Sequence, residues 1–109
     1  MLTAGLYILG VVLLGGLILS GFVLGGERSP RVLARAHGLG GAAGIAIAAI
    51  AVLQGASPML VGAIAVLMLA AAGGVFISHF HPRAASPELA VILHAIAGGT
   101  GVAMLWLGL

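Results

Sequence analysis

The stretch MLVGAIAVLMLAAAGGVFI, residues 59–77, decides the fold, because it holds no charged side chain over a length that crosses a membrane. About 20 helical residues, at about 1.5 Å rise each, span a hydrocarbon core roughly 30 Å thick. Three further apolar stretches of similar length occupy residues 2–25, 32–53 and 89–109. Since none of them alternates polar with apolar residues, as a barrel strand does, we predict four transmembrane helices.

The composition also indicates an integral membrane protein. Hydrophobic residues make up 62% of the chain and charged residues 6%, and the mean hydropathy is +1.34. A soluble domain has about a quarter of its residues charged, so this chain cannot cover itself with a polar surface. The sequence contains no cysteine, which excludes disulfides, thiolate metal sites and iron–sulfur ligation.

The connections between the apolar stretches are short, at residues 26–31, 54–58 and 79–88. Short connections make sequential helices antiparallel neighbours, so we predict an all-α up-down bundle that forms one domain over residues 1–109. A proline marks each later helix start, and a serine before it is a candidate N-cap. These pairs are Ser29 with Pro30, Ser57 with Pro58, and Ser86 with Pro87.

The two halves of the sequence resemble each other at an offset of 57 residues, which superposes His37 on His94. The same offset places Ser29, Pro30, Gly41, Gly44 and Ala46 on Ser86, Pro87, Gly98, Gly101 and Ala103, and Gly5 and Gly16 on Gly62 and Gly73. We therefore predict a bundle of two duplicated helical hairpins, residues 1–53 and 58–109.

The two repeated histidines are the strongest candidates for a functional site, because an imidazole in hydrocarbon is costly unless something binds it. Each lies seven residues after its proline, about 10 Å along the helix, so both have the same depth. A twofold axis along the membrane normal makes the second and fourth helices face each other. We predict that His37 and His94 are the two axial metal ligands of one haem b between them.

Glycines follow each histidine at four and seven residues, on the same helix face. These residues are Gly41 and Gly44 in the first half and Gly98 and Gly101 in the second. We predict that they bind the cofactor by leaving a surface free of side chains for the flat macrocycle. The alternative is that they allow ordinary close packing of helices in a membrane.

The four basic residues lie in or beside the first and third connections, and they are Arg28, Arg31, Arg35 and Arg83. The positive-inside rule places these connections in the cytoplasm and both termini outside a cell membrane such as the bacterial inner membrane. This explanation leaves no reason to expect a nucleic acid partner. Arg35, two residues before His37, is a candidate partner for haem propionates in the cytoplasmic half.

Two further histidines, His79 and His81, lie on the arginine side and nearer the surface. Three roles stay open for them: contact with the haem propionates, proton handling for a quinone, or an interfacial position without further function.

The paired histidines in four helices resemble the four-helix b-type membrane cytochromes, such as the haem-carrying core of the cytochrome b561 family and the membrane anchors of succinate dehydrogenases. The segment Ile92-Leu93-His94-Ala95 with Thr100-Gly101 is similar to such an anchor, although the arginine expected beside the histidine is absent. The resemblance implies an electron-transfer protein rather than an independent enzyme, with quinone or redox proteins as partners. Membrane lipid is a further expected partner, and the sequence leaves open whether the chain acts alone, as a homo-oligomer or in a larger complex. The b561 family carries two haems, but the outer half of this chain has no histidine.

Three other functions compete with this interpretation. A small multidrug exporter needs a glutamate within its first helix, and this sequence has none there. A histidine-lined zinc or copper site, or a small metal or proton transporter, would use the histidines but not the glycines. A structural accessory subunit without haem is the third alternative.

Overall fold

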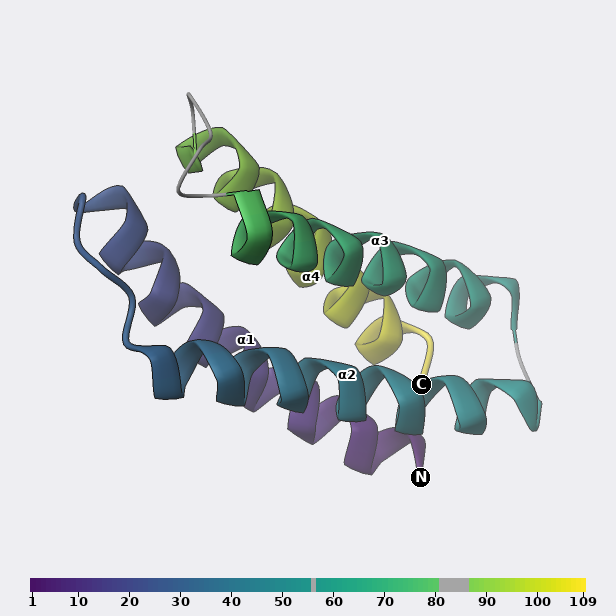
Figure 1. Cartoon of the computed structure of the whole chain (residues 1–109). Helices are drawn as coiled ribbons and strands as arrows, with labels where there is room; N and C mark the ends of the chain where they lie inside the picture. Colours follow the sequence, from purple (N-terminus) through teal and green to yellow (C-terminus); the bar gives the residue numbers. More distant parts are fainter. Residues whose placement is uncertain (56, 81–86) are drawn as a thin grey trace.

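The computed structural model describes residues 1–55, 57–80 and 87–109, and these residues form four α-helices without a strand (Figure 1). In chain order the helices are α1 (Leu2–Leu24), α2 (Arg31–Leu53), α3 (Pro58–Phe80) and α4 (Pro87–Leu107). All four are long and apolar enough to cross a membrane. The all-α, four-helix architecture of a membrane protein, predicted from the sequence, is therefore confirmed.

The prolines stand where the sequence predicts helix starts. Pro58 and Pro87 are the first residues of α3 and α4. Pro30 is the N-cap residue of α2, with an extended backbone at φ −60° and ψ 124°. A proline costs a helix nothing at these positions, because the first N–H groups of a helix have no partner within it.

Two of the three predicted serine caps fall on described residues, and one of these two is observed. The Ser57 hydroxyl accepts a hydrogen bond from the Leu60 N–H at 3.3 Å, which satisfies one free donor of α3. The prediction for Ser29 is wrong, because Pro30 occupies the N-cap position of α2 and α2 has no side-chain cap. Ser86 lies outside the described residues.

The end of α1 requires a glycine. Gly26 has φ +73°, the only positive φ in the described part of the chain. The Glu27 N–H donates to the Phe22 carbonyl at 2.8 Å and the Gly26 N–H to the Val23 carbonyl at 3.0 Å. These two bonds form the Schellman motif that ends many helices, and glycine adopts its left-handed residue without steric cost.

The third helix is longer than the sequence predicts. It continues to Phe80 instead of ending at residue 77, so His79 lies in its last turn and not in a connection. No glycine or proline interrupts the chain between Val75 and Phe80, and nothing therefore stops the helix earlier.

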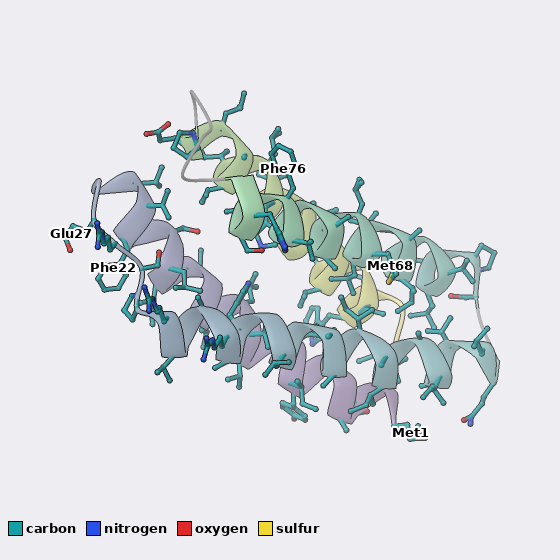
Figure 2. The ribbon with its side chains drawn as sticks, viewed as in Figure 1. Met1, Phe22, Glu27, Met68 and Phe76 are labelled. Carbon is teal, nitrogen blue, oxygen red and sulfur yellow. The ribbon has the colours of Figure 1, made fainter. Side chains whose placement is uncertain are left out.

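Each helix packs most extensively on its partner within a hairpin, α1 on α2 and α3 on α4. Smaller interfaces join α1 to α4 and α2 to α3, so α2 and α4 are diagonal in the bundle. Both termini lie toward the same end as the last turn of α2 and the first turn of α3, in a body of 42 × 23 × 19 Å (Figure 1). Phe22 and Glu27 lie at the end opposite Met1 (Figure 2).

The core is concentrated in the half of the bundle nearest the termini. Its buried side chains come from all four helices: Leu9, Ile45, Ala48, Val52, Leu60, Ala63, Leu67 and Leu105. In the other half, where the histidines lie, Ala70 and Val91 are the only buried hydrophobic residues among those described. Most of the buried side chains in the described residues therefore lie in the half nearest the termini.

Candidate functional site

His37 on α2 reaches across to the backbone of α1. Its Nδ1 lies 2.9 Å from the Val12 carbonyl oxygen, and the side chain is half-buried. The imidazole lies on Gly16, where an added Cβ would come within 2.7 Å of Cε1. The ring therefore occupies the space that any side chain at position 16 would need.

His94 on α4 makes the same contacts with α3. Its Nδ1 lies 2.8 Å from the Ala70 carbonyl oxygen, and this side chain is also half-buried. An added Cβ at Gly74 would come within 3.0 Å of its Cε1. Both hairpins thus hold an imidazole against a glycine of the neighbouring helix and bond it to a backbone carbonyl.

In each hairpin the accepting carbonyl lies four residues before the glycine. In an α-helix this carbonyl already accepts the N–H of that glycine, and it has a second lone pair. The missing Cβ at Gly16 or Gly74 lets the imidazole approach that lone pair. Since a carbonyl only accepts, Nδ1 must carry the proton, and in the neutral ring Nε2 is the unprotonated nitrogen.

The two imidazoles lie close together across the bundle, with ring centroids 5.9 Å apart and planes at 76°. Two imidazoles that bind one metal from opposite sides through Nε2, with bonds of about 2 Å, have centroids about 6 Å apart. Metal-bound histidines usually donate their other ring N–H to a carbonyl or carboxylate, as the Nδ1 groups of His37 and His94 do here. The two imidazoles are therefore close enough together to form one site.

The structure corrects the register of the repeat. His37 and His94 differ by 57 residues, but their carbonyl acceptors Val12 and Ala70 differ by 58. The buried residues Leu9 and Leu67 follow the same offset of 58. By its contacts, Gly16 therefore corresponds to Gly74. By the sequence offset of 57 residues, it corresponds to Gly73.

Two of the four predicted haem-facing glycines face leucines instead. An added Cβ at Gly44 would lie 2.8 Å from Leu9 Cγ, and one at Gly101 would lie 2.6 Å from Leu67 Cγ. The prediction that Gly44 and Gly101 leave a free surface for a ring is therefore wrong in this structure. Both permit close packing within a hairpin, because a leucine fills the space beside each.

The other two glycines leave more room. At Gly98 an added Cβ would meet nothing within 4 Å. At Gly41 it would meet only Val12 Cγ1, at 3.7 Å, which is an ordinary contact. The difference follows from the residues on the opposing helices, since Val12 is larger than its counterpart Ala70.

The other predicted site residues that the structure describes are Arg35 and His79, and both lie at the surface. Arg35 is exposed on α2. His79 is exposed, and its Nδ1 lies 3.1 Å from the Val75 carbonyl and 3.2 Å from the Ser78 hydroxyl on its own helix. Among the described residues, no three histidines, cysteines or acidic residues come close enough to hold a metal ion. His81 and Arg83 lie outside the described residues.

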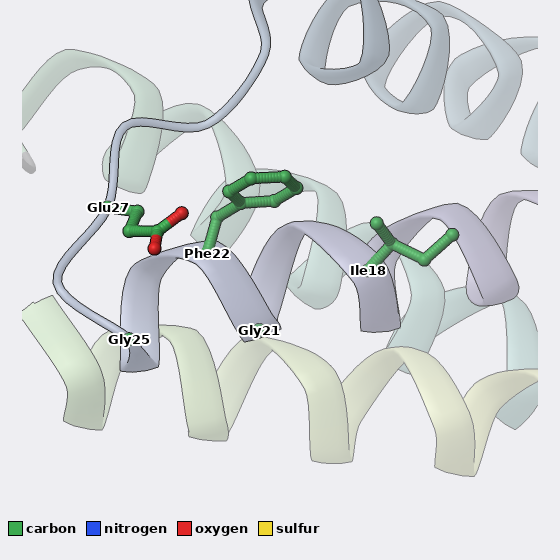
Figure 3. A pocket seen from close by; sticks show the side chains of 5 residues that line it. All are labelled: Ile18, Gly21, Phe22, Gly25 and Glu27. Atoms are coloured by element: carbon green, nitrogen blue, oxygen red, sulfur yellow. The ribbon is translucent and has the colours of Figure 1, made fainter.

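A separate pocket opens at the end of α1 (Figure 3). It is lined by Ile18, Gly21, Phe22, Gly25 and Glu27 and has a volume of about 260 Å³. Small-molecule sites usually have roughly 300–1,000 Å³ and convergent polar groups, whereas Glu27 is the only charged residue in this lining. The pocket shares no residue with the histidine pair, so the pair remains the candidate site.

Comparison with protein-family models, curated proteins and solved structures finds no match to this chain.

Sequence reasoning missed the residues that orient the imidazoles, namely Gly74 and the carbonyls of Val12 and Ala70. A signal was present in the doubled glycines Gly15-Gly16 and Gly73-Gly74. The sequence does not indicate which glycine of each doublet contacts the imidazole, because this depends on how each helix is rotated against its partner.

Proposed function

We propose that this protein is a membrane cytochrome of b type that transfers electrons through one haem held by His37 and His94. The proposal rests on the histidine pair, with ring centroids 5.9 Å apart and each Nδ1 on a backbone carbonyl. This arrangement leaves both Nε2 atoms as the nitrogens able to bind iron.

A haem bound by two imidazoles supplies reversible one-electron transfer, with no iron position open to oxygen. The task of the chain is then to fix both ligands and to exclude water. The carbonyl bonds of His37 and His94 fix the rings, and the apolar helices exclude water. Among the described residues no polar or charged side chain is buried.

The packing of the bundle supports a cofactor in the histidine half. The core side chains gather near the termini, and around the histidines Ala70 and Val91 alone among described hydrophobic residues are buried. Gly98, one turn after His94, faces open space. A flat ring would contact Gly98 and Gly41, while Gly44 and Gly101 belong to the packed half.

The charges suggest how the protein is oriented. Arg28, Arg31 and Arg35 are all exposed at the end of the bundle nearest the histidines. The positive-inside rule puts this end in the cytoplasm and the haem in the cytoplasmic half, with Arg35 near enough in sequence to serve a propionate. The described residues offer one histidine pair, which would hold one haem. Electrons would then have to come from and go to partners outside the chain, namely quinone or redox proteins, as in the b-type cytochromes that the sequence resembles.

A histidine-bound zinc or copper ion without porphyrin is the second candidate, and one observation favours it: Leu9 and Leu67 occupy the space beside Gly44 and Gly101. Zinc takes four ligands, however, and the described residues bring only two histidines together. A porphyrin supplies four ligands of its own, and two histidines complete the set.

The test is the visible spectrum and metal content of the full chain purified from haem-replete cells. We expect a reduced-minus-oxidised spectrum with a sharp α-band and one iron per chain. His37→Ala and His94→Ala should each lose the haem, whereas His79→Ala, which removes an exposed imidazole, should retain it. Zinc or copper without an α-band, or haem retained in His94→Ala and lost in His79→Ala, would contradict the proposal.

A further inference from the structure

We propose that Gly16 and Gly74 are positioning residues that fix the tautomer and the ring plane of His37 and His94. Because each glycine has no side chain, the imidazole can lie against the backbone of the neighbouring helix, within hydrogen-bond distance of one carbonyl. The inference concerns the chain's own residues, and its consequences for an iron spectrum rest on the proposed function.

Each of the two glycines lies in close contact with an imidazole ring. A Cβ at position 16 would lie 2.7 Å from His37 Cε1 and 3.3 Å from Nδ1, and a Cβ at position 74 would lie 3.0 Å from His94 Cε1. The ring atoms are not the end of a long flexible chain, since an imidazole turns about only two bonds. An alanine at position 16 therefore moves the ring of His37, and one at position 74 makes the ring of His94 give by a few tenths of an ångström.

Movement of the imidazole breaks its hydrogen bond to the carbonyl of the neighbouring helix. The Nδ1 contacts with the Val12 and Ala70 carbonyls are 2.9 and 2.8 Å long, and N–H···O hydrogen bonds need distances of about 2.7–3.2 Å and weaken steeply when the angle falls below about 120°. A displaced imidazole loses the bond that keeps the proton on Nδ1, so both tautomers become populated. It also loses the orientation that sets the two ring planes at 76°.

The chain supplies a matched control beside each glycine. A Cβ at Gly73 would lie 3.8 Å from His94 Nδ1, an ordinary contact, and a Cβ at Gly15 would meet only Leu33 Cδ1 at 3.9 Å. Gly15→Ala and Gly73→Ala thus make the same chemical change one residue away. Only the neighbours Gly16 and Gly74 should affect the histidines.

The experiment measures imidazole 15N chemical shifts in the haem-free, 15N-histidine-labelled full chain in detergent micelles. In the unsubstituted protein we expect both His37 and His94 as the Nδ1–H tautomer. Gly16→Ala should shift the nitrogens of His37 toward a tautomer mixture and leave the tautomer of His94 unchanged. Gly74→Ala should do the reverse, and Gly15→Ala and Gly73→Ala should change neither.

Electron paramagnetic resonance of the ferric, haem-loaded protein gives a second readout. Imidazole planes near 76° predict a strongly anisotropic low-spin signal, and Gly16→Ala or Gly74→Ala should change its anisotropy. Because an Nδ1–H bond makes Nε2 more basic, its loss should also raise the reduction potential. Gly73→Ala should keep the original signal and potential.

These outcomes separate this inference from the proposed function. If the tautomers respond as expected but the protein takes up no haem, the positioning role stands and the cytochrome proposal fails. Unchanged 15N shifts in both Gly16→Ala and Gly74→Ala would overturn the positioning role. It would also be overturned if both variants lost their helical structure while the two controls kept theirs, because the glycines would then serve packing alone.

Discussion

The sharpest test of the helix packing is a pair of alanine substitutions three residues apart on α4, Gly101→Ala and Gly98→Ala. A Cβ at Gly101 would lie 2.6 Å from Leu67 Cγ, 2.8 Å from its Cδ2 and 3.3 Å from its backbone nitrogen. Leu67 is 3% exposed within the core and has little room to move. Overpacking of this kind costs about 1–3 kcal/mol.

At Gly98 an added Cβ would meet nothing within 4 Å. Alanine favours a helix over glycine by about 1 kcal/mol, so Gly98→Ala should leave the free energy of unfolding unchanged or raise it by up to that amount. Gly101→Ala gains the same helix propensity, so its overpacking should place its free energy of unfolding about 1–3 kcal/mol below that of Gly98→Ala. The comparison of the two variants on one helix therefore isolates the contact with Leu67.

The assay is reversible unfolding of the haem-free protein in mixed micelles, followed by circular dichroism. A double variant that also carries Leu67→Ala lacks the side chain with which the Cβ of Gly101→Ala would clash. In the double variant the cost of Gly101→Ala should largely disappear, which gives a coupling energy close to the cost of the single substitution.

The reasoning is refuted if Gly101→Ala and Gly98→Ala have the same free energy of unfolding. That result would mean that α3 and α4 meet in a different register from the one described. An unchanged cost of Gly101→Ala on the Leu67→Ala background would show that Leu67 is not the neighbour responsible.

Two further predictions concern the other hairpin and the orientation in the membrane. Gly5→Ala should destabilise the protein more than Gly44→Ala. A Cβ at position 5 would meet the α2 backbone, with the Ala48 nitrogen at 3.0 Å, whereas a Cβ at position 44 would meet side chains. Equal losses of stability in the unfolding assay would contradict this. Because the chain has no cysteine, Arg28→Cys in intact cells should resist an impermeant thiol reagent and Ser57→Cys should react with it. The opposite labelling pattern would show that the arginine end faces outward.

The sequence by itself determined the helices, because each depends on local chemistry. Uninterrupted apolar stretches must satisfy their backbone hydrogen bonds internally in lipid, and the helix is the simplest solution. Pro58 and Pro87 begin helices because they lack an N–H that the first turn does not need. The equal spacing of His37 and His94 from their prolines also placed both imidazoles at one depth before any tertiary contact was known.

Only the tertiary structure decided what the glycines do, because their roles depend on the rotation and sliding of one helix against another. A shift of one residue turns a helix by about 100°, so the offset of 58 between the α1 and α3 contacts selects Gly74 over Gly73 as the neighbour of His94. The same rotation turns Gly101 toward Leu67 and leaves Gly98 facing open space. No local property distinguishes these glycines, and the packing of neighbouring helices assigns each its role.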